Sequence, residues 1–326
     1  MVETLEQVEL CILPLNISCM SMLVSPKATF IKTLLYCIVL LTVMLNLLVV
    51  ISISHFRQLH TTTNVFLLSL AVSDLLVGAV VMPTTVTQQS CWFPGKITCT
   101  LLFLLLGFTL TSSSVGSMVL ISVDRYVAIC VPLHYSSMIT TKRAKICVSL
   151  CWICSVIYNL IILKDHVSQI DMFNPCTQEC TVFISYISGL VDFIVTFFVP
   201  VTVIIVLYMR VFVVAVSQAR VMRSQIVAVK SRTQTVIVKK SEMKAARTLG
   251  IVLLVFILCL CPYYGSFLAG EDMTADGSSA VTWLFSCNST LNPLIYAFFY
   301  PWFRKAIKII VSLQILQPSS CDFKIL

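Results

Sequence analysis

Charged residues are scarce in this chain. Asp, Glu, Lys and Arg make up 11% of its 326 residues, whereas about 25% is usual in a soluble domain. So few charges could not cover the surface of a soluble fold of this length, and the mean hydropathy of +0.98 points the same way. The composition therefore predicts a polytopic, all-α membrane protein.

Two other signals are missing. Residues 1–28 lack the basic region of a secretory signal peptide and carry Glu3, Glu6 and Glu9 instead, so we expect the first membrane span to act as the insertion signal. The sequence also shows no metal-ligand cluster and no nucleophile–base pair, and its four histidines lie in loops or at span ends. It therefore predicts no enzymatic activity.

Long apolar segments are abundant. Seven of them approach the ~20 residues that cross the hydrocarbon core, at roughly 30–54, 64–86, 100–123, 146–163, 184–209, 247–268 and 278–299. The next stretch, PWFRKAIKIIVSLQIL, mixes basic and apolar residues as an interfacial helix does. We predict a seven-transmembrane helix bundle at 30–300, a tail at 1–29, and an amphipathic eighth helix with a short tail at 301–326.

Charge sets the orientation of these spans. One orientation places all but four of the 22 Lys and Arg residues on the inner side, which predicts an extracellular N-terminus and a cytoplasmic tail in the plasma membrane. The net charge of +8 is then a topology signal and not a sign of nucleic-acid binding. We expect the basic run 220–247 to contact anionic membrane lipids, and Asn16-Ile-Ser18 to be a glycosylation site.

An aspartate interrupts the apolar stretch GLVDFIVTFFVP at 189–200. A carboxylate at the centre of a membrane helix costs at least ~2.5–3.5 kcal/mol. Asp192 lies eight residues before Pro200, about 12 Å along a helix toward its outer end. No Lys or Arg lies at its depth, so the residue is well placed to hold a cationic ligand. The alternative is a protonated, structural aspartate bonded to Ser188 or Thr196.

Short motifs carry a resemblance to a known family. The third span ends in Asp124-Arg125-Tyr126, and the seventh contains Asn292-Pro293-Leu294-Ile295-Tyr296. With seven spans, these make the chain resemble a rhodopsin-like G-protein-coupled receptor. Further matching positions are Asn46, the run 70–74, Trp152, Pro200, Tyr208, Phe256 and the run 259–263.

A narrower resemblance follows from NSTLNPLIYAFFYPWF at 288–303 and from CWFPGKITC at 91–99. Both are similar to segments of the trace amine-associated receptors, and within that family the chain looks most like the fish branch. The resemblance implies a small protonated amine as ligand, a stimulatory heterotrimeric G protein as partner, elevation of cyclic AMP, and a role in olfaction.

The usual amine counter-ion of the superfamily is missing. It lies in the third span, eighteen residues before the Arg of the Asp-Arg-Tyr motif, and here that position is Gly107. Counting from Cys99 gives Leu106 instead, because this span carries one extra residue. Fish members of the family show the same exchange, so the resemblance implies that Asp192 binds the amine in an inverted pose. We expect further ligand contacts from Tyr263, Tyr264, Thr111, Thr196, Trp283, Ser286 and Gly107.

The second intramembrane acid has a family role as well. Asp74 with Ser114, Ser289 and Asn292 matches the pocket that holds a sodium ion in related receptors, and oxygen ligands suit such a cation. The alternatives are a water-filled polar network and a protonated Asp74. No other cofactor is expected.

The resemblance also implies two disulfides, Cys99–Cys180 and Cys19–Cys176, with Cys91 and Cys11 as alternative partners. At the cytoplasmic face we expect Arg125 to pair with Asp124 and, in the inactive state, with Glu242. Opening of the sixth span would break this latch and admit a G-protein helix. Tyr208 and Tyr296 would reorganise around Arg125, and Tyr126, Asn292 and Pro293 belong to the same motifs.

Three positions depart from the family pattern: Leu260, where an aromatic switch is usual, Leu45 and Thr62. One alternative function is a related receptor with a non-amine ligand, which the loss of the third-span acid favours and Asp192 opposes. A transporter is a weaker alternative, since we see neither an internal repeat nor a continuous chain of ionisable groups.

Overall fold

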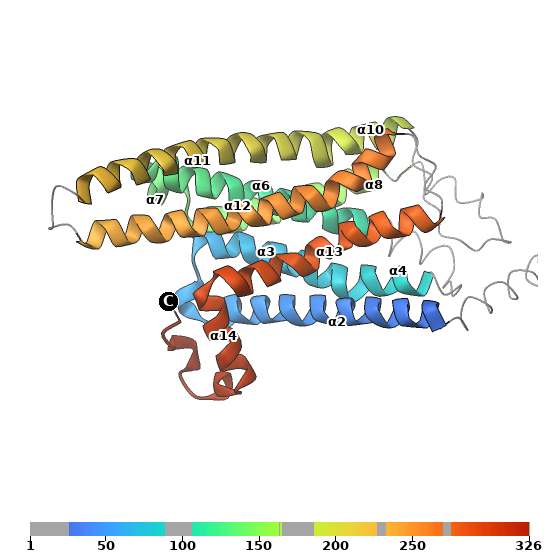
Figure 1. The fold of residues 1–326 in the computed structure, drawn as a ribbon, viewed down its shortest axis with the longest axis horizontal. Helices are drawn as coiled ribbons and strands as arrows, with labels where there is room; N and C mark the ends of the chain where they lie inside the picture. Colours follow the sequence, from blue (N-terminus) through green and yellow to red (C-terminus); the bar gives the residue numbers. More distant parts are fainter. Residues whose placement is uncertain are drawn as a thin grey trace, which may run out of the picture.

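The computed structural model describes residues 26–88, 106–162, 164, 186–226, 233–269 and 275–325. Within these ranges all regular structure is helical, and the long helices run alongside one another (Figure 1). The first half of the bundle consists of α2 (Pro26–His55), α3 (Thr62–Leu76) continued by η2 (Val77–Val81) and α4 (Met82–Gln88), α6 (Phe108–Cys130) and α8 (Thr141–Ile162).

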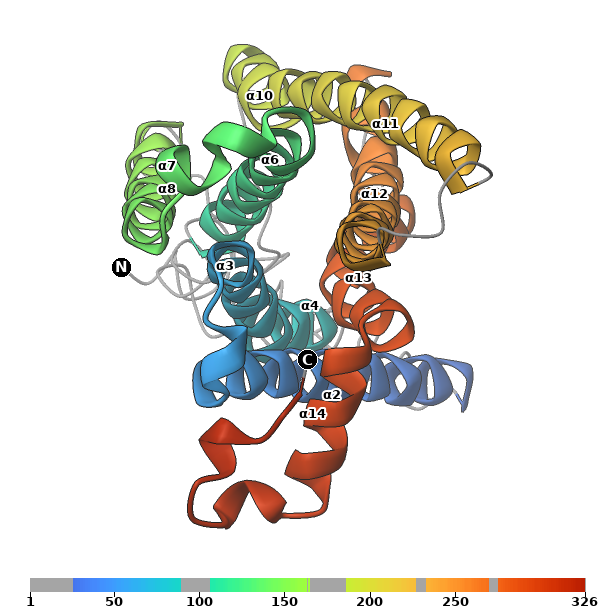
Figure 2. The same ribbon diagram turned by 90° about the vertical axis from the view of Figure 1, so that its left-hand side faces the viewer.

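The second half begins with α10 (Tyr186–Asp192), which continues through η6 (Phe193–Phe198) into α11 (Val199–Ile226). Next come α12 (Thr233–Leu268) and α13 (Ala275–Phe299), and then α14 (Pro301–Val311), which crosses the end of the bundle. Seen end-on, the long helices surround a common axis and α14 lies next to α2 (Figure 2). Short turns η1 (Arg57–Leu59), η4 (Pro132–His134), α7 (Tyr135–Met138), η7 (Gln314–Leu316) and η8 (Ser320–Asp322) complete the described chain.

The bundle is apolar on its outside. Six helices of the described chain are long and apolar enough to cross a membrane, and α13 completes the predicted seven. Phe30, Leu40 and Phe198 are all more than half exposed, as side chains that face lipid are expected to be. The interior instead holds polar groups that join the helices. Asn46 on α2 donates to the Ser289 carbonyl on α13 at 2.9 Å, and Trp152 on α8 donates to Ser69 on α3 at 3.1 Å.

The described parts of the predicted spans are helical, but several helices reach further than predicted. The third ends at Cys130 instead of 123, the fifth at Ile226 instead of 209, and the sixth begins at Thr233 instead of 247. The extra turns carry polar and basic residues, which end an apolar run but do not end a helix. The first helix begins at Pro26, inside the tail predicted for 1–29.

Two π-helical segments were not predicted, η2 in the second span and η6 in the fifth. Leu106 and Gly107 are π-helical as well. A π turn accommodates one additional residue in a helix. The sequence indicated one extra residue in the third span, and the π turn at Leu106 and Gly107 can hold it.

The amphipathic helix α14 stops earlier than the stretch 301–316 that predicted it. It ends at Val311, and Leu313 adopts a left-handed φ of 57°. Trp302, Phe303 and Ala306 on α14 are buried.

The chain then turns back toward the start of the bundle. The Ile325 backbone donates to the Gln58 side chain at 3.1 Å, and Asp322 lies 3.5 Å from Arg57. Ser320 lies 2.9 Å from the His55 ring nitrogen. The described end of the chain is therefore fixed to the end of α2.

Candidate functional site

Asp192 is buried among three hydroxyl groups from different parts of the bundle. Thr196, one turn along in η6, donates to its Oδ1 at 2.8 Å. Tyr158 on α8 donates to the same oxygen at 3.3 Å, and Tyr264 on α12 donates to Oδ2 at 3.2 Å. A carboxylate is an acceptor-only group with about four lone-pair sites, so three donors suit the ionised form. Among the described residues no cation pairs with it.

Aromatic rings line one side of this carboxylate. The Tyr264 ring stacks on Phe197 with a centroid separation of 4.7 Å and lies 5.9 Å from Phe193. Tyr263 meets Tyr264 edge-on at 5.1 Å and Phe285 at 5.3 Å. A protonated amine beside such rings gains cation–π attraction of about 0.5–2 kcal/mol.

The other predicted contacts are arranged differently. Trp283 packs with Val39, Met82 and Leu110 in a separate apolar cluster between the first, second, third and seventh helices. Its buried indole N–H has no hydrogen-bond partner among the residues that the structure describes.

Three smaller predicted residues, Ser286, Thr111 and Gly107, take part in hydrogen bonds within their own helices. Ser286 donates to the Thr282 carbonyl of α13, and Thr111 donates to the carbonyl of half-buried Gly107. Of the predicted contacts, Thr196 and Tyr264 hydrogen-bond to Asp192, and Tyr263 packs against Tyr264. The structure places Trp283 in another cluster, and Thr111 and Ser286 bond to their own backbones.

Asp74 is fully enclosed and bonded to the seventh helix. Ser289 donates to its Oδ1 and Asn292 Nδ2 to its Oδ2, both at 2.8 Å. The hydroxyl of Ser114 lies 2.8 Å from Ser73 and not on Asp74. The Asn292 amide oxygen is buried and has no hydrogen-bond partner within the described ranges. The donor set thus offers carboxylate, hydroxyl and amide oxygens, which fit a sodium ion.

Arg125 is paired within its own motif. Its Nε and Nη2 donate to Asp124 Oδ2 at 3.0 and 2.5 Å. Thr63 on α3 donates to the same oxygen at 2.8 Å and accepts a short hydrogen bond from Arg125. Tyr135 on α7 donates to Asp124 Oδ1 at 2.9 Å. Burial, and then the charge of Asp124, raise the pKa of the Tyr135 phenol above its usual range, so it remains a donor at neutral pH.

Tyr208 and Tyr296, which were expected to reorganise around Arg125, have buried hydroxyls. Those of Tyr208 on α11 and Tyr296 on α13 are buried without a hydrogen-bond partner among the described residues, and the Tyr208 ring faces Gly250 of α12. Tyr126 packs against Ile129 and Val211. Pro293 lies inside α13.

Several predicted features lie outside the described residues. Glu242 belongs to α12, but its pairing with Arg125 concerns a side chain that the structure does not describe. Cys19, Cys99, Cys176 and Cys180, with their two expected disulfides, and the sequon at Asn16 fall in undescribed segments as well.

Sequence reasoning missed four partners: Tyr158, Phe197, Thr63 and Tyr135. The first lies in an apolar span, where a lone hydroxyl is a weak signal of an interhelical contact. Phe197 repeats Phe193 at a spacing of four residues, which does indicate a shared helix face. No pattern in the sequence indicated that Thr63 or Tyr135 would reach Asp124.

Known proteins identify the family. Residues 45–296 match the 7 transmembrane receptor (rhodopsin family). Trace amine-associated receptor 13c of Danio rerio is 38% identical over 301 residues, which are 87% of this chain and 86% of that receptor. The chain is a trace amine-associated receptor. Two more relatives are trace amine-associated receptor 1 of Mus musculus (35% identical, 90% and 92% covered) and receptor 8c of Rattus norvegicus (37%, 96% and 95%).

Membership settles the class of this trace amine-associated receptor. It is a rhodopsin-family G-protein-coupled receptor and not an enzyme. It works with a G protein and a small ligand, as a multi-pass protein of the plasma membrane.

Proposed function

We propose that this receptor detects small protonated amines and that Asp192 is the ammonium counter-ion. The observation that carries the proposal is a buried carboxylate with three hydroxyl donors and no cationic partner among the described residues. An isolated charge of this kind is costly in a membrane helix, and a cationic ligand would offset that cost. The names of the relatives agree with an amine ligand.

The hydroxyl groups fit both roles, because a Thr or Tyr hydroxyl can donate to a carboxylate or accept from a protonated carboxyl group. The counter-ion role is favoured by the cost of a buried acid without a cationic partner among the described residues. Three donors leave about one lone-pair site for an ammonium group. The rings of Tyr263, Tyr264 and Phe197 then lie where they can surround the rest of a small amine.

The signalling half of the proposal concerns Arg125. Ligand binding would favour a state in which Arg125 leaves Asp124, Thr63 and, as the sequence predicts, Glu242, and a stimulatory G protein would then raise cyclic AMP. Tyr208 and Tyr296, whose buried hydroxyls have no partner in the described part of the chain, are suited to receive Arg125 or each other in that state. An allosteric sodium ion at Asp74, Ser114, Ser289 and Asn292 and olfactory expression belong to the same proposal.

The test is a cyclic AMP reporter assay in cells that express the receptor, with a panel of amines and, for each active amine, the alcohol of the same skeleton. Asp192→Asn and Asp192→Glu are measured beside the parent, with surface expression determined for all. Asp322→Asn is the matched control, because it makes the same chemical change in an exposed tail residue.

We expect amines but not alcohols to activate the parent, Asp192→Asn to be silent at normal surface expression, and Asp322→Asn to respond as the parent does. An Asp192→Asn variant with full amine potency would contradict the counter-ion role. Activation of the parent by the alcohols would instead favour a receptor for neutral ligands.

A further inference from the structure

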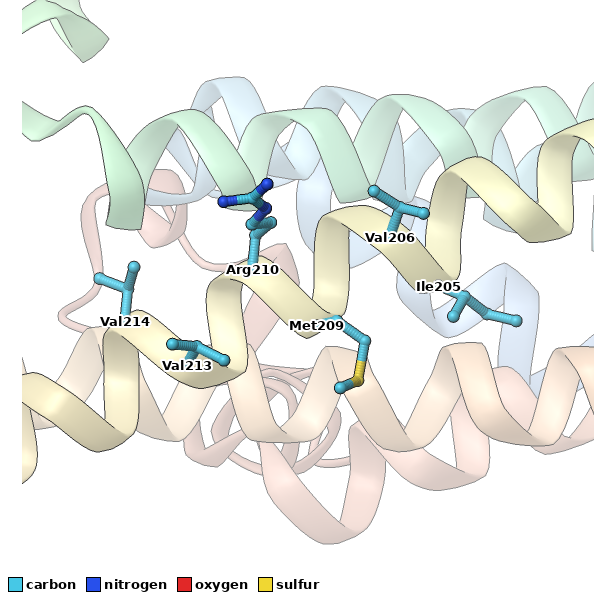
Figure 3. A pocket seen from close by; sticks show the side chains of 6 residues that line it. All are labelled: Ile205, Val206, Met209, Arg210, Val213 and Val214. Atoms are coloured by element: carbon cyan, nitrogen blue, oxygen red, sulfur yellow. The ribbon is translucent and has the colours of Figure 1, made fainter.

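A groove of about 410 Å³ lies far along the fifth helix from Asp192, on the outer side of α11. Its lining is Ile205, Val206, Met209, Arg210, Val213 and Val214. In Figure 3, Arg210 and Val206 project from one side of α11 and Met209 from the other, with the rest of the bundle behind. The groove therefore opens away from the bundle interior, toward the space that lipid fills.

Arg210 is the unusual member of this lining. It is exposed and adjoins the cytoplasmic end of the predicted fifth span. Among the described residues it has neither an ion-pair nor a hydrogen-bond partner. A guanidinium at the edge of a membrane span reaches the interface, where it can pair with an anion. The charge of Arg210 thus lacks a partner within the described protein.

The depth of Arg210 matches that of lipid headgroups. It comes one residue after the fifth span that the sequence predicts at 184–209, at the end of that span where most of the basic residues lie. A flexible arginine at this height can extend to the phosphate level of the leaflet on the same side as α14.

The apolar part of the groove extends from Arg210 toward the middle of the membrane. Ile205, Val206 and Met209 are 48%, 54% and 58% exposed, so their surface is available to a hydrocarbon chain. A guanidinium binds phosphate through two parallel hydrogen bonds. One phospholipid can fill the whole groove. Its phosphate would lie at Arg210, and its acyl chain would run from there toward the middle of the membrane along the apolar residues.

We propose that this groove binds one anionic phospholipid, with the headgroup on Arg210 and an acyl chain along Ile205, Val206 and Met209. An anionic headgroup is favoured over a zwitterionic one, because choline would place a second cation beside the guanidinium. The site is separate from the amine pocket, and the proposal holds whether or not Asp192 binds an amine.

The experiment uses the full receptor in nanodiscs of phosphatidylcholine with a minority of phosphatidylserine. After transfer to mild detergent, native mass spectrometry counts the lipids of each kind that stay on one chain. Three variants are compared with the parent. Arg210→Gln removes the charge, Val206→Trp fills the groove on an exposed face, and Lys145→Gln removes a charge from another exposed position at the same end of the bundle.

We expect the parent to retain one phosphatidylserine in preference to phosphatidylcholine. Arg210→Gln should lower this retention about fivefold or more, the effect of one basic residue at an anionic surface. Val206→Trp should lower it with Arg210 intact, and Lys145→Gln should leave it unchanged.

Equal retention by Arg210→Gln and the parent would overturn the proposal. So would an equal loss in Lys145→Gln, which would show attraction by surface charge alone, or an unchanged Val206→Trp, which would show that the apolar groove takes no part. Should Arg210→Gln fail to insert, Val206→Trp and Lys145→Gln still decide between these outcomes.

Discussion

The Tyr264 hydroxyl donates a hydrogen bond of 3.2 Å to Oδ2 of Asp192, and its ring stacks on Phe197. The hydroxyl of Tyr264 thus orients the carboxylate, while its ring forms part of the aromatic lining beside it. Tyr264 belongs to α12 and Asp192 to α10. The candidate ligand site is therefore shared between the fifth and the sixth helices.

Two substitutions separate these roles of Tyr264. Tyr264→Phe should lower amine potency about 10- to 100-fold, because a hydrogen bond to a charged group contributes about 1.5–3 kcal/mol. Tyr264→Leu should lower it further, since cation–π attraction is lost as well. Dose–response curves for cyclic AMP measure both, with Tyr186→Phe as an exposed control. Higher potency of Tyr264→Phe would show that the hydroxyl competes with the ligand.

Thr63 should restrain Arg125 in the resting state. Thr63→Val keeps the side-chain shape but removes the hydroxyl that contacts both Asp124 and Arg125. Loss of about 1 kcal/mol from the resting state should raise ligand-free cyclic AMP by up to about fivefold per receptor at the surface. The exposed Ser136→Ala on α7 serves as control. Unchanged basal signalling in Thr63→Val would contradict a restraining role.

Sodium should stabilise the folded receptor through Asp74. A ligand that binds only the folded state raises stability with its concentration. We therefore expect sodium chloride to raise the unfolding temperature above that in potassium chloride of equal ionic strength. Asp74→Asn should lose the difference between the two salts while remaining folded. A difference of the same size in Asp74→Asn would place the sodium effect elsewhere.

Gly116 should be required for close packing of α6 on α8. A Cβ at this position would collide with the sulfur of Cys151, so Gly116→Ala should destabilise the receptor by about 1–3 kcal/mol. Adding Cys151→Ala removes that sulfur and should restore most of the loss. Thermal unfolding followed by intrinsic fluorescence gives both values. A double variant as unstable as Gly116→Ala would show that the collision is not the cause.

The sequence predicted much of this molecule for identifiable reasons. Apolar length located the helices, because a membrane span must satisfy its backbone within the helix. The hydrogen bonds of Arg125 with Asp124 and of Asn292 with Asp74 involve residues of the Asp-Arg-Tyr and Asn-Pro motifs, which are recognisable in the sequence.

The remainder depends on information that a single sequence does not hold. Tyr158 meets Asp192 only because α8 and α10 approach each other at that height. The fifth helix extends to Ile226 because its polar turns leave the membrane while remaining helical. The π segments η2 and η6 change the register of side chains in spans whose composition shows no break.

The contacts of residues 320–325 with residues 55–58 also bear on the order of assembly. Chains are made from the N-terminus, so α2 enters the membrane before the other described helices. Its cytoplasmic end acquires these partners only after the last turns have been synthesised. The helix that is inserted first is thus the one whose final anchoring must wait for the end of translation.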